Sequence, residues 1–423
     1  MSPTTETPAK CHTRPGPPDA PAPVLVRAIS LPLLILYGLG VTIGAGIYVL
    51  IGASVALAGI YAPASFLVAA FVMMFSAGSF AELSGRHPKS AGEAIYVEAA
   101  FGRPWLTVAT GGFLVLSGIV AAATISLGSA GYLLVLLDLP RPLVIVAVVG
   151  LMGAIAAWGI VESVAFAAIL TVIEILGLIT IVVAGVWHHP EILRQLPEVL
   201  PPLSDTSALT GVVAASLIAF FAFIGFDDIV SVVEETKNPT RTMPLGILLT
   251  LAIAVLIYFS VVSVAVLTMP LDALGSSTAP VSLMFENLTG FSPLAITLIA
   301  IIATLNGIVI QIIMGSRVLY GLAKAGRIPA VLGRVNPVTR TPLIATFLVT
   351  ALVLMLALFF PIEKLAEMTT QVILVIFVLV NAALIKMKWR KVAAPQGIIT
   401  VPSWVPVAGL LSCLALLVGP FLI

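Results

Sequence analysis

Long runs of apolar residues, separated by short clusters of charged residues, proline and glycine, make up most of the chain. The runs lack the alternation of polar and apolar residues that marks the strands of a membrane-spanning barrel. Each is long enough for a helix of about 20 residues, the length that crosses a bilayer. The pattern therefore predicts an all-α polytopic membrane protein with about eleven spans. They fall near residues 29–57, 62–83, 105–137, 142–160, 164–187, 208–233, 244–269, 293–322, 342–361, 367–386 and 403–422.

The composition excludes several other classes of protein. Of the 423 residues, 60% are hydrophobic and 9% are charged, whereas soluble domains carry roughly 25% charged residues. So few charges could not cover the surface of a soluble fold of this length. The formal net charge of +1 argues against a nucleic-acid partner. Cysteine and histidine lack the spacing of a metal site, so neither a metal nor a cofactor is expected.

The positions of lysine and arginine orient the spans. With the N-terminus in the cytoplasm, Arg141, Arg194 and Lys364 alone among the 20 lysine and arginine residues fall in outer segments. The positive-inside rule predicts such a bias. We therefore expect a multi-pass protein of the cell membrane, plasma or inner, with a cytoplasmic N-terminus. Residues 1–27, rich in proline and threonine, are expected to form a disordered cytoplasmic tail.

Three acidic residues are expected to remain at membrane depth after this assignment. Glu174 lies in the fifth span, and Asp227 and Asp228 lie in the sixth. A charge at the middle of a bilayer costs a few kcal/mol even on permissive scales, so such residues are functional candidates. Two structural alternatives remain open. Glu174 would then be a protonated packing residue, and an aspartate would stabilise a broken helix.

Two spans carry comparable glycine-rich interruptions. The first contains Gly38-Leu-Gly-Val-Thr-Ile-Gly-Ala-Gly, and the sixth contains Phe223-Ile-Gly-Phe-Asp-Asp. Each opens a block of five spans, and an odd number of spans gives the second block the inverted orientation. Broken helices at matching places in inverted repeats mark the substrate site of many secondary transporters, because unwound backbone can bind a zwitterion. The alternative is close helix packing, since Gly40 and Gly44 have the small-xxx-small spacing.

This division predicts the organisation of the chain. The first inverted repeat covers residues 28–187, an outer loop covers 188–207 and the second repeat covers 208–388. A loop and the eleventh span fill residues 389–423.

Four stretches resemble the amino acid–polyamine–organocation (APC) superfamily of transporters, in particular its cationic amino acid transporter branch. They occur in the order of the family and along nearly the whole chain. The resemblance implies a leucine-transporter-like fold with two five-helix inverted repeats and one extra transmembrane helix. The stretches are Gly44-Ala-Gly-Ile-Tyr-Val-Leu, Pro88-Lys-Ser-Ala-Gly-Glu-Ala-Ile-Tyr, Phe223-Ile-Gly-Phe-Asp followed by Glu234-Glu-Thr-Lys-Asn-Pro, and Ser316-Arg-Val-Leu-Tyr-Gly-Leu-Ala-Lys-Ala-Gly-Arg-Ile-Pro.

By position, the resemblance also implies a substrate site. Carbonyl groups of Phe221 and Ile224 would bind the substrate amine, and the Phe221 ring would act as a gate. Backbone groups that would bind the substrate carboxylate belong to Thr42, Ile43, Ala45 and Gly46.

Three residues in or near this site depart from the pattern of the family. Many relatives have serine or threonine where this chain has Ala45, and proton-coupled relatives often have a lysine where Glu174 stands. Glu174 is the expected ion-coupling residue, through a proton or through sodium. Asp228 replaces a small neutral residue and would favour cationic substrates if it faces the site; Asp227 has a substrate or a structural role.

The expected function is secondary active transport of amino acids across the cell membrane, by proton symport and alternating access. Its partners are an amino acid, a proton or sodium, and the lipid bilayer. An exchanger of amino acids or polyamines, a sodium-coupled carrier and an uncoupled carrier remain open. An intramembrane enzyme is disfavoured because the sequence contains no nucleophile or metal-hydrolase motif, and a channel would need a pore built by several subunits.

Overall fold

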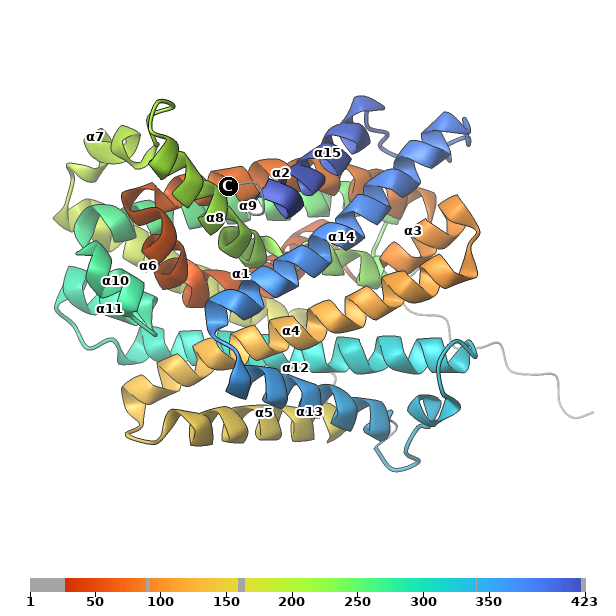
Figure 1. Cartoon of the computed structure of the whole chain (residues 1–423), viewed down its shortest axis with the longest axis horizontal. Coiled ribbons are helices and arrows are strands. Elements are labelled where there is room, and N and C mark those ends of the chain that lie inside the picture. The colour runs from red at the N-terminus through yellow and green to blue at the C-terminus, as the bar shows by residue number, and fades with distance from the viewer. Residues whose placement is uncertain (1–26, 89–91, 159–163, 340, 420–423) are drawn as a thin grey trace, which may run out of the picture.

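The computed structural model describes residues 27–88, 92–158, 164–339 and 341–419. Within these ranges the secondary structure is helical, apart from one isolated β-bridge (Figure 1). The predicted tail of residues 1–27 lies almost wholly outside the described residues.

A helix occupies each of the predicted apolar segments. These helices are α1 (Leu31–Ala58), α2 (Ala62–Arg86), α4 (Pro104–Leu136), α5 (Arg141–Trp158), α6 (Val164–His188), α8 (Thr206–Phe223), α9 (Pro239–Thr268), α12 (Leu294–Lys324), α13 (Leu343–Phe359), α14 (Ile362–Trp389) and α15 (Trp404–Val418). Shorter elements connect them: α3 (Gly92–Phe101), α7 (Ile192–Gln195), α10 (Leu271–Ser276), α11 (Pro280–Thr289) and the 3-10 helices η1 (Gly59–Tyr61), η2 (Leu196–Val199), η3 (Asp228–Glu235) and η4 (Ala330–Gly333).

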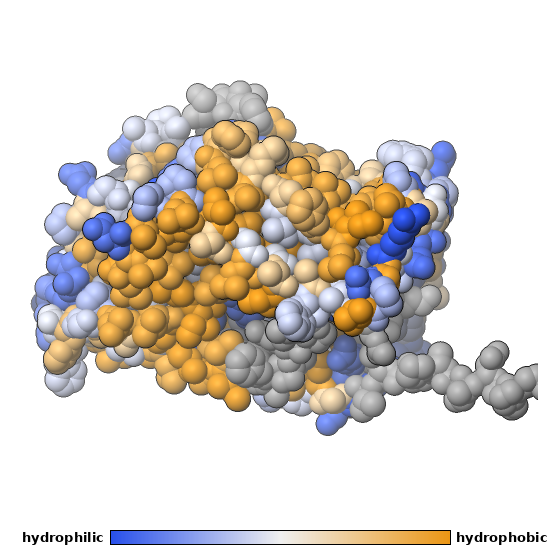
Figure 2. All heavy atoms as spheres, turned by 90° about the horizontal axis from the view of Figure 1, so that it is seen from below, coloured by the Kyte–Doolittle hydropathy of each residue, from blue (hydrophilic) through white to orange (hydrophobic). Residues whose placement is uncertain are grey.

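The helices have the length and composition of a multi-pass membrane protein. Eight segments of the described chain are long and apolar enough to cross a membrane, and three further apolar helices are shorter. The predicted number of eleven spans stays a prediction. Figure 2 shows apolar side chains across the middle of one face and hydrophilic side chains gathered at its two ends. The 33 residues of α4 extend about 50 Å, so this helix is tilted or projects beyond a bilayer core of about 30 Å.

The long helices pack in two groups. α1 and α2 both pack against α8 and α9 in the upper half of Figure 1, and α4, α5, α12 and α13 pack together in the lower half. α6 and α14 each contact both groups. The most extensive contacts within the groups pair α1 with α8, α2 with α9, α4 with α12 and α5 with α13. Each pair therefore joins helices at the same place in the two predicted five-span blocks.

α1 and the sixth span run antiparallel in direct contact. Before α1 begins, the backbone N–H of Ile29 donates a hydrogen bond of 3.0 Å to the carbonyl of Glu235, beyond the sixth span. Further along, a β-carbon on Gly46 would lie 2.2 Å from the Cα of Ala222, so the two backbones touch there. Residue numbers rise along α1 while they fall along its neighbour, which gives the two spans opposite directions.

The predicted break in the first span is wrong, because α1 is a continuous α-helix from Leu31 to Ala58. Its glycines serve close packing instead. A β-carbon on Gly40 would lie 2.1 Å from Thr171 Oγ1, and one on Gly44 would lie 3.3 Å from the carbonyl oxygen of Ala303. Close packing, the alternative reading of the glycine motif, accounts for these residues.

The predicted break in the sixth span is confirmed. α8 ends at Phe223, Ile224 is extended, and Gly225 has a φ of 123°, which glycine adopts without strain. The N–H of Gly225 donates a hydrogen bond of 2.9 Å to Asp227 Oδ1, and the 3-10 helix η3 follows. Asp227 thus satisfies a backbone donor that the break releases, which is the structural role weighed for it.

Glu82 of α2 is a buried acid that was not among the three expected at membrane depth, and its side chain is 0% exposed. Its Oε1 accepts hydrogen bonds of 2.9 and 2.8 Å from Arg86, and its Oε2 lies 2.7 Å from Lys388 Nζ. Oε2 also accepts a bond of 2.8 Å from the N–H of Val401. Two cations and a backbone donor compensate the buried charge, and the cluster fastens α2 to α14 and to the segment before α15.

Replacing Gly46 by alanine tests the contact between α1 and α8. The added methyl group meets the backbone of Ala222, so we expect a loss of about 1–3 kcal/mol, the usual cost of overpacking. A thermal unfolding curve in detergent measures the effect. Gly112→Ala on α4 is the matched control, since a β-carbon there meets nothing within 4 Å. Equal melting temperatures for Gly46→Ala and the wild type would contradict the prediction.

Candidate functional site

The predicted substrate residues meet where α1 faces the break in the sixth span. Thr42 and Ile43 on α1 are 1% and 0% exposed, and Phe221 on α8 is 3% exposed. Ile224 is half-buried at the break itself. A β-carbon on Gly225 would lie 3.0 Å from the backbone nitrogen of Thr42. The structure therefore brings the two predicted halves of the site together.

The backbone groups expected to bind a carboxylate lie inside an intact helix. Ala45 and Gly46 belong to the continuous α1, so their N–H groups point along the helix toward preceding carbonyls. The side chain of Ala45 is not among the described ones. In this conformation the span thus does not present the unwound backbone that the resemblance implies.

Tyr258 of α9 connects the two halves of the site. Its hydroxyl lies 2.9 Å from the carbonyl oxygens of both Thr42 and Ala222 and donates its single proton to this pair of acceptors. The ring packs on Phe66 and Phe223, with centroid distances of 6.0 and 4.9 Å. Tyr258 is not among the residues predicted from the sequence, although a tyrosine in an apolar span needs a partner for its hydroxyl.

Glu174 of α6 faces the glycine segment of α1. A β-carbon on Gly44 would lie 3.6 Å from Oε2 and 3.8 Å from Oε1 of Glu174, and the residue is 3% exposed. The Tyr48 hydroxyl donates a bond of 2.9 Å to the backbone carbonyl of Glu174. In turn, the Tyr132 hydroxyl donates to the backbone carbonyl of Tyr48. The predicted coupling residue is thus buried against the first span, and α1, α4 and α6 are fastened together beside it.

A second group of acids lies on the α3 side of the break. Glu93 of α3 is 7% exposed and interacts electrostatically with Asp227 and Asp228. Burial, and then the negative charge of Asp227, raise the pKa of Glu93 to about 8. Glu93 therefore holds a proton at neutral pH. Glu93 belongs to one of the four family-like motifs but is not among the predicted site residues, because a polar loop gives no sign of burial.

A cavity of about 370 Å³ lies next to the site. It is lined by parts of α1, α4, α5, α10, α13 and α14, and Val49 on its wall stands three residues beyond Gly46 on α1. Arg141 and Glu363 supply opposite charges to its lining. None of the predicted site residues lines the cavity, so it adjoins the site without containing it.

Comparisons with known proteins give consistent matches. A family model described as amino acid permease matches residues 29–423. Branched-chain amino acid permease BcaP of Bacillus subtilis (strain 168) is 28% identical over 391 residues, which cover 86% of this chain and 81% of that protein. Cationic amino acid transporter 3, mitochondrial, of Arabidopsis thaliana is 30% identical over 405 residues, which cover 90% of this chain and 64% of the plant protein. The chain thus spans less than two thirds of that relative.

A further relative has a different kind of substrate in its name. The methylthioribose transporter of Bacillus subtilis (strain 168) is 25% identical over 413 residues, covering 92% of this chain and 86% of that protein. The family and these relatives are permeases and transporters, not enzymes.

Removing the hydroxyl of Tyr258 tests its bridging role. Tyr258→Phe keeps the ring but leaves two buried carbonyls without this donor, so we expect a loss of about 1–3 kcal/mol in stability. Thermal unfolding in detergent measures it. Tyr320→Phe, near the end of α12, is the control. If both variants melt together with the wild type, the bridge contributes nothing.

Changing Glu93 to glutamine tests the buried proton. A carboxyl whose pKa is raised from 4.5 to about 8 in the folded protein binds its proton more tightly folded than unfolded. Stability then falls as pH rises through this interval. We expect the melting temperature of the wild type to fall more steeply between about pH 5 and about pH 9 than that of Glu93→Gln. Glu98→Gln, an exposed site on the same helix, should follow the wild type; parallel curves for all three proteins would refute the assignment.

Proposed function

The chain belongs to the amino acid permease family, as its four motifs indicated, and we propose that it moves amino acids across the cell membrane by proton symport and alternating access. The observation that carries the proposal is the burial of Glu174 against Gly44, beside the contact between α1 and the broken sixth span. Gain or loss of a proton by Glu174 would change the charge packed against Gly44, and so would alter the packing of the first span.

We propose that the two five-span blocks are inverted repeats. The antiparallel packing of α1 on the sixth span supports this, because the first helices of two inverted blocks run in opposite directions. The four principal helix pairs also join matching members of the blocks. In the proposed cycle, the group of α1, α2, α8 and α9 rocks against the group of α4, α5, α12 and α13. The distribution of lysine and arginine supports a cytoplasmic N-terminus.

The substrate would bind between α1 and the break in the sixth span. Phe221 and Ile224 would offer carbonyls to the amine, as the resemblance implies. For the carboxylate, α1 would have to open at its glycines and release the N–H groups of Ala45 and Gly46. A turn that contains Gly44 and Gly46 opens at low cost, since glycine is a poor helix former by about 1 kcal/mol per residue. The cavity beside Val49 would be the outer entrance.

Two acidic residues are candidates for carrying the coupling proton. Glu174 touches α1 directly, and Glu93 holds a proton beside the break in the sixth span. We assign coupling to Glu174, because its carboxylate lies at the glycine segment that must open. Asp227 is occupied with the N–H of Gly225, and Asp228 interacts with Asp227 and Glu93. These contacts support a structural role at the break for both aspartates.

Transport by reconstituted protein tests the proposal. Liposomes that contain the protein are given an inward proton gradient and a labelled panel of branched-chain, cationic and neutral amino acids, with methylthioribose as a further candidate. We expect gradient-driven uptake of at least one amino acid by the wild type. Glu174→Gln should lose the response to the gradient while it still exchanges substrate, because a glutamine cannot release a proton. Glu286→Gln, an exposed site on α11, is the matched control.

The possible outcomes test the coupling ion, the mode of transport and the substrate separately. Uptake that ignores the gradient in the wild type refutes proton coupling, and dependence on sodium instead would assign a sodium-coupled carrier. Exchange without net uptake would assign an exchanger. Transport of methylthioribose alone, or of nothing in the panel, would refute the amino acid substrate.

A further inference from the structure

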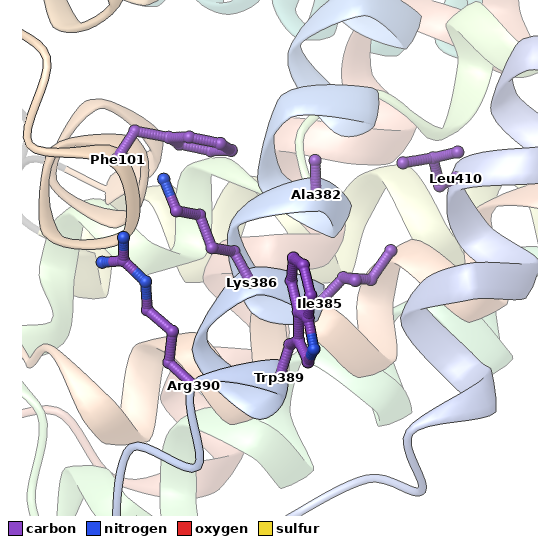
Figure 3. Close-up of a pocket in the computed structure, with 7 residues that line it drawn as sticks. All are labelled: Phe101, Ala382, Ile385, Lys386, Trp389, Arg390 and Leu410. Atoms are coloured by element: carbon purple, nitrogen blue, oxygen red, sulfur yellow. The ribbon is translucent and has the colours of Figure 1, made fainter.

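A cleft with an apolar wall and a basic rim lies between α14, α15 and the end of α3. Its volume is about 470 Å³. Figure 3 shows the ammonium group of Lys386 and the guanidinium group of Arg390 extending on the side of Phe101, whereas Ile385 and Leu410 lie on the other side. The cleft therefore has a cationic part and an apolar part next to each other.

Among the described residues, no ion pair neutralises the cationic part. Arg390 and Arg103 both lie in electrostatic range of Lys386. The ion pairs found among the described residues involve none of these three side chains. Lys386 Nζ instead lies 4.3 Å from the centroid of the Phe101 ring. Like charges gathered in this way favour a polyvalent or strongly negative ligand.

Exposed tryptophans place this rim at the surface of a membrane. Trp389, on the cleft, is 85% exposed, and Trp105 and Trp404, at the starts of α4 and α15, are 66% and 61% exposed. Tryptophan is enriched at the level of lipid headgroups, where an apolar ring meets water. Ile385 precedes Trp389 by one turn of α14, and Leu410 follows Trp404 along α15, so both lie further into these apolar helices than the tryptophans.

We propose that the cleft binds an anionic phospholipid. The phosphate would lie between Lys386 and Arg390, where basic side chains can bind it with charge-assisted hydrogen bonds. One acyl chain would follow the wall formed by Ile385 and Leu410. A basic pocket between transmembrane helices is the arrangement by which anionic headgroups are recognised. The proposal depends on the membrane location of the chain and not on its transport activity.

Competition between lipids tests this site on the full-length protein in detergent. Native mass spectrometry counts retained lipid after addition of phosphatidylglycerol or phosphatidylcholine with the same acyl chains. We expect the wild type to retain phosphatidylglycerol in preference, and the preference to weaken with salt. The double change Lys386→Gln and Arg390→Gln should lower the apparent affinity about tenfold or more, because each cation near an anionic headgroup contributes.

Three comparisons make the result decisive. Lys324→Gln with Arg327→Gln removes two exposed cations elsewhere on the protein and should leave binding unchanged. Lys386→Arg with Arg390→Lys keeps both charges and should retain the lipid. Soluble glycerol phosphate should stabilise the wild type far less than the lipid does in thermal unfolding. Equal retention of the two lipids, an equal loss in both neutralised pairs, or full stabilisation by glycerol phosphate would overturn the proposal.

Discussion

The rest of the structure depends on one close contact, the meeting of α1 with the sixth span at the level of the backbone. Gly46 allows the approach because it has no β-carbon, and Gly225 turns the sixth span toward Thr42 with a φ of 123°. The contact brings two carbonyls, those of Thr42 and Ala222, within reach of the Tyr258 hydroxyl. It also sets where Glu174 can lie, on the neighbouring surface of α1 at Gly44.

Much of this fold could be predicted from the sequence, because the apolar medium leaves few choices. A long apolar run must satisfy its own backbone, so each predicted segment is a helix. The break in the sixth span was predictable from the sequence Gly225-Phe-Asp-Asp within an apolar run. The continuity of α1 was not, because glycines at small-xxx-small spacing serve both a break and close packing. The structure decides between them, because α1 is continuous and the backbone of Ala222 packs directly on Gly46.

The acidic residues also divide into those that the sequence identifies and those that only the tertiary structure reveals. Glu174 could be chosen because a carboxylate in an apolar run is conspicuous, whereas Glu93 and Glu82 could not. Glu93 stands in a polar segment whose burial depends on how α3 packs against η3. Glu82 stands one helical turn before Arg86, near the end of its run, and its partner Lys388 comes from a distant helix. Burial and pairing of these acids are properties of the tertiary structure.

The two backbone hydrogen bonds of Ile29 have a mechanical consequence. Ile29 donates to Glu235 at 3.0 Å and accepts from the N–H of Lys237 at 2.9 Å, so the entry to α1 is bonded to the exit of the sixth span. If α1 swung outward alone, both bonds would break at a cost of about 1 kcal/mol each. Movement of the two segments together keeps both bonds. We therefore expect the entry to α1 and the exit of the sixth span to move as one unit, so that any opening at this end of the protein would occur outside this pair of segments and not between them.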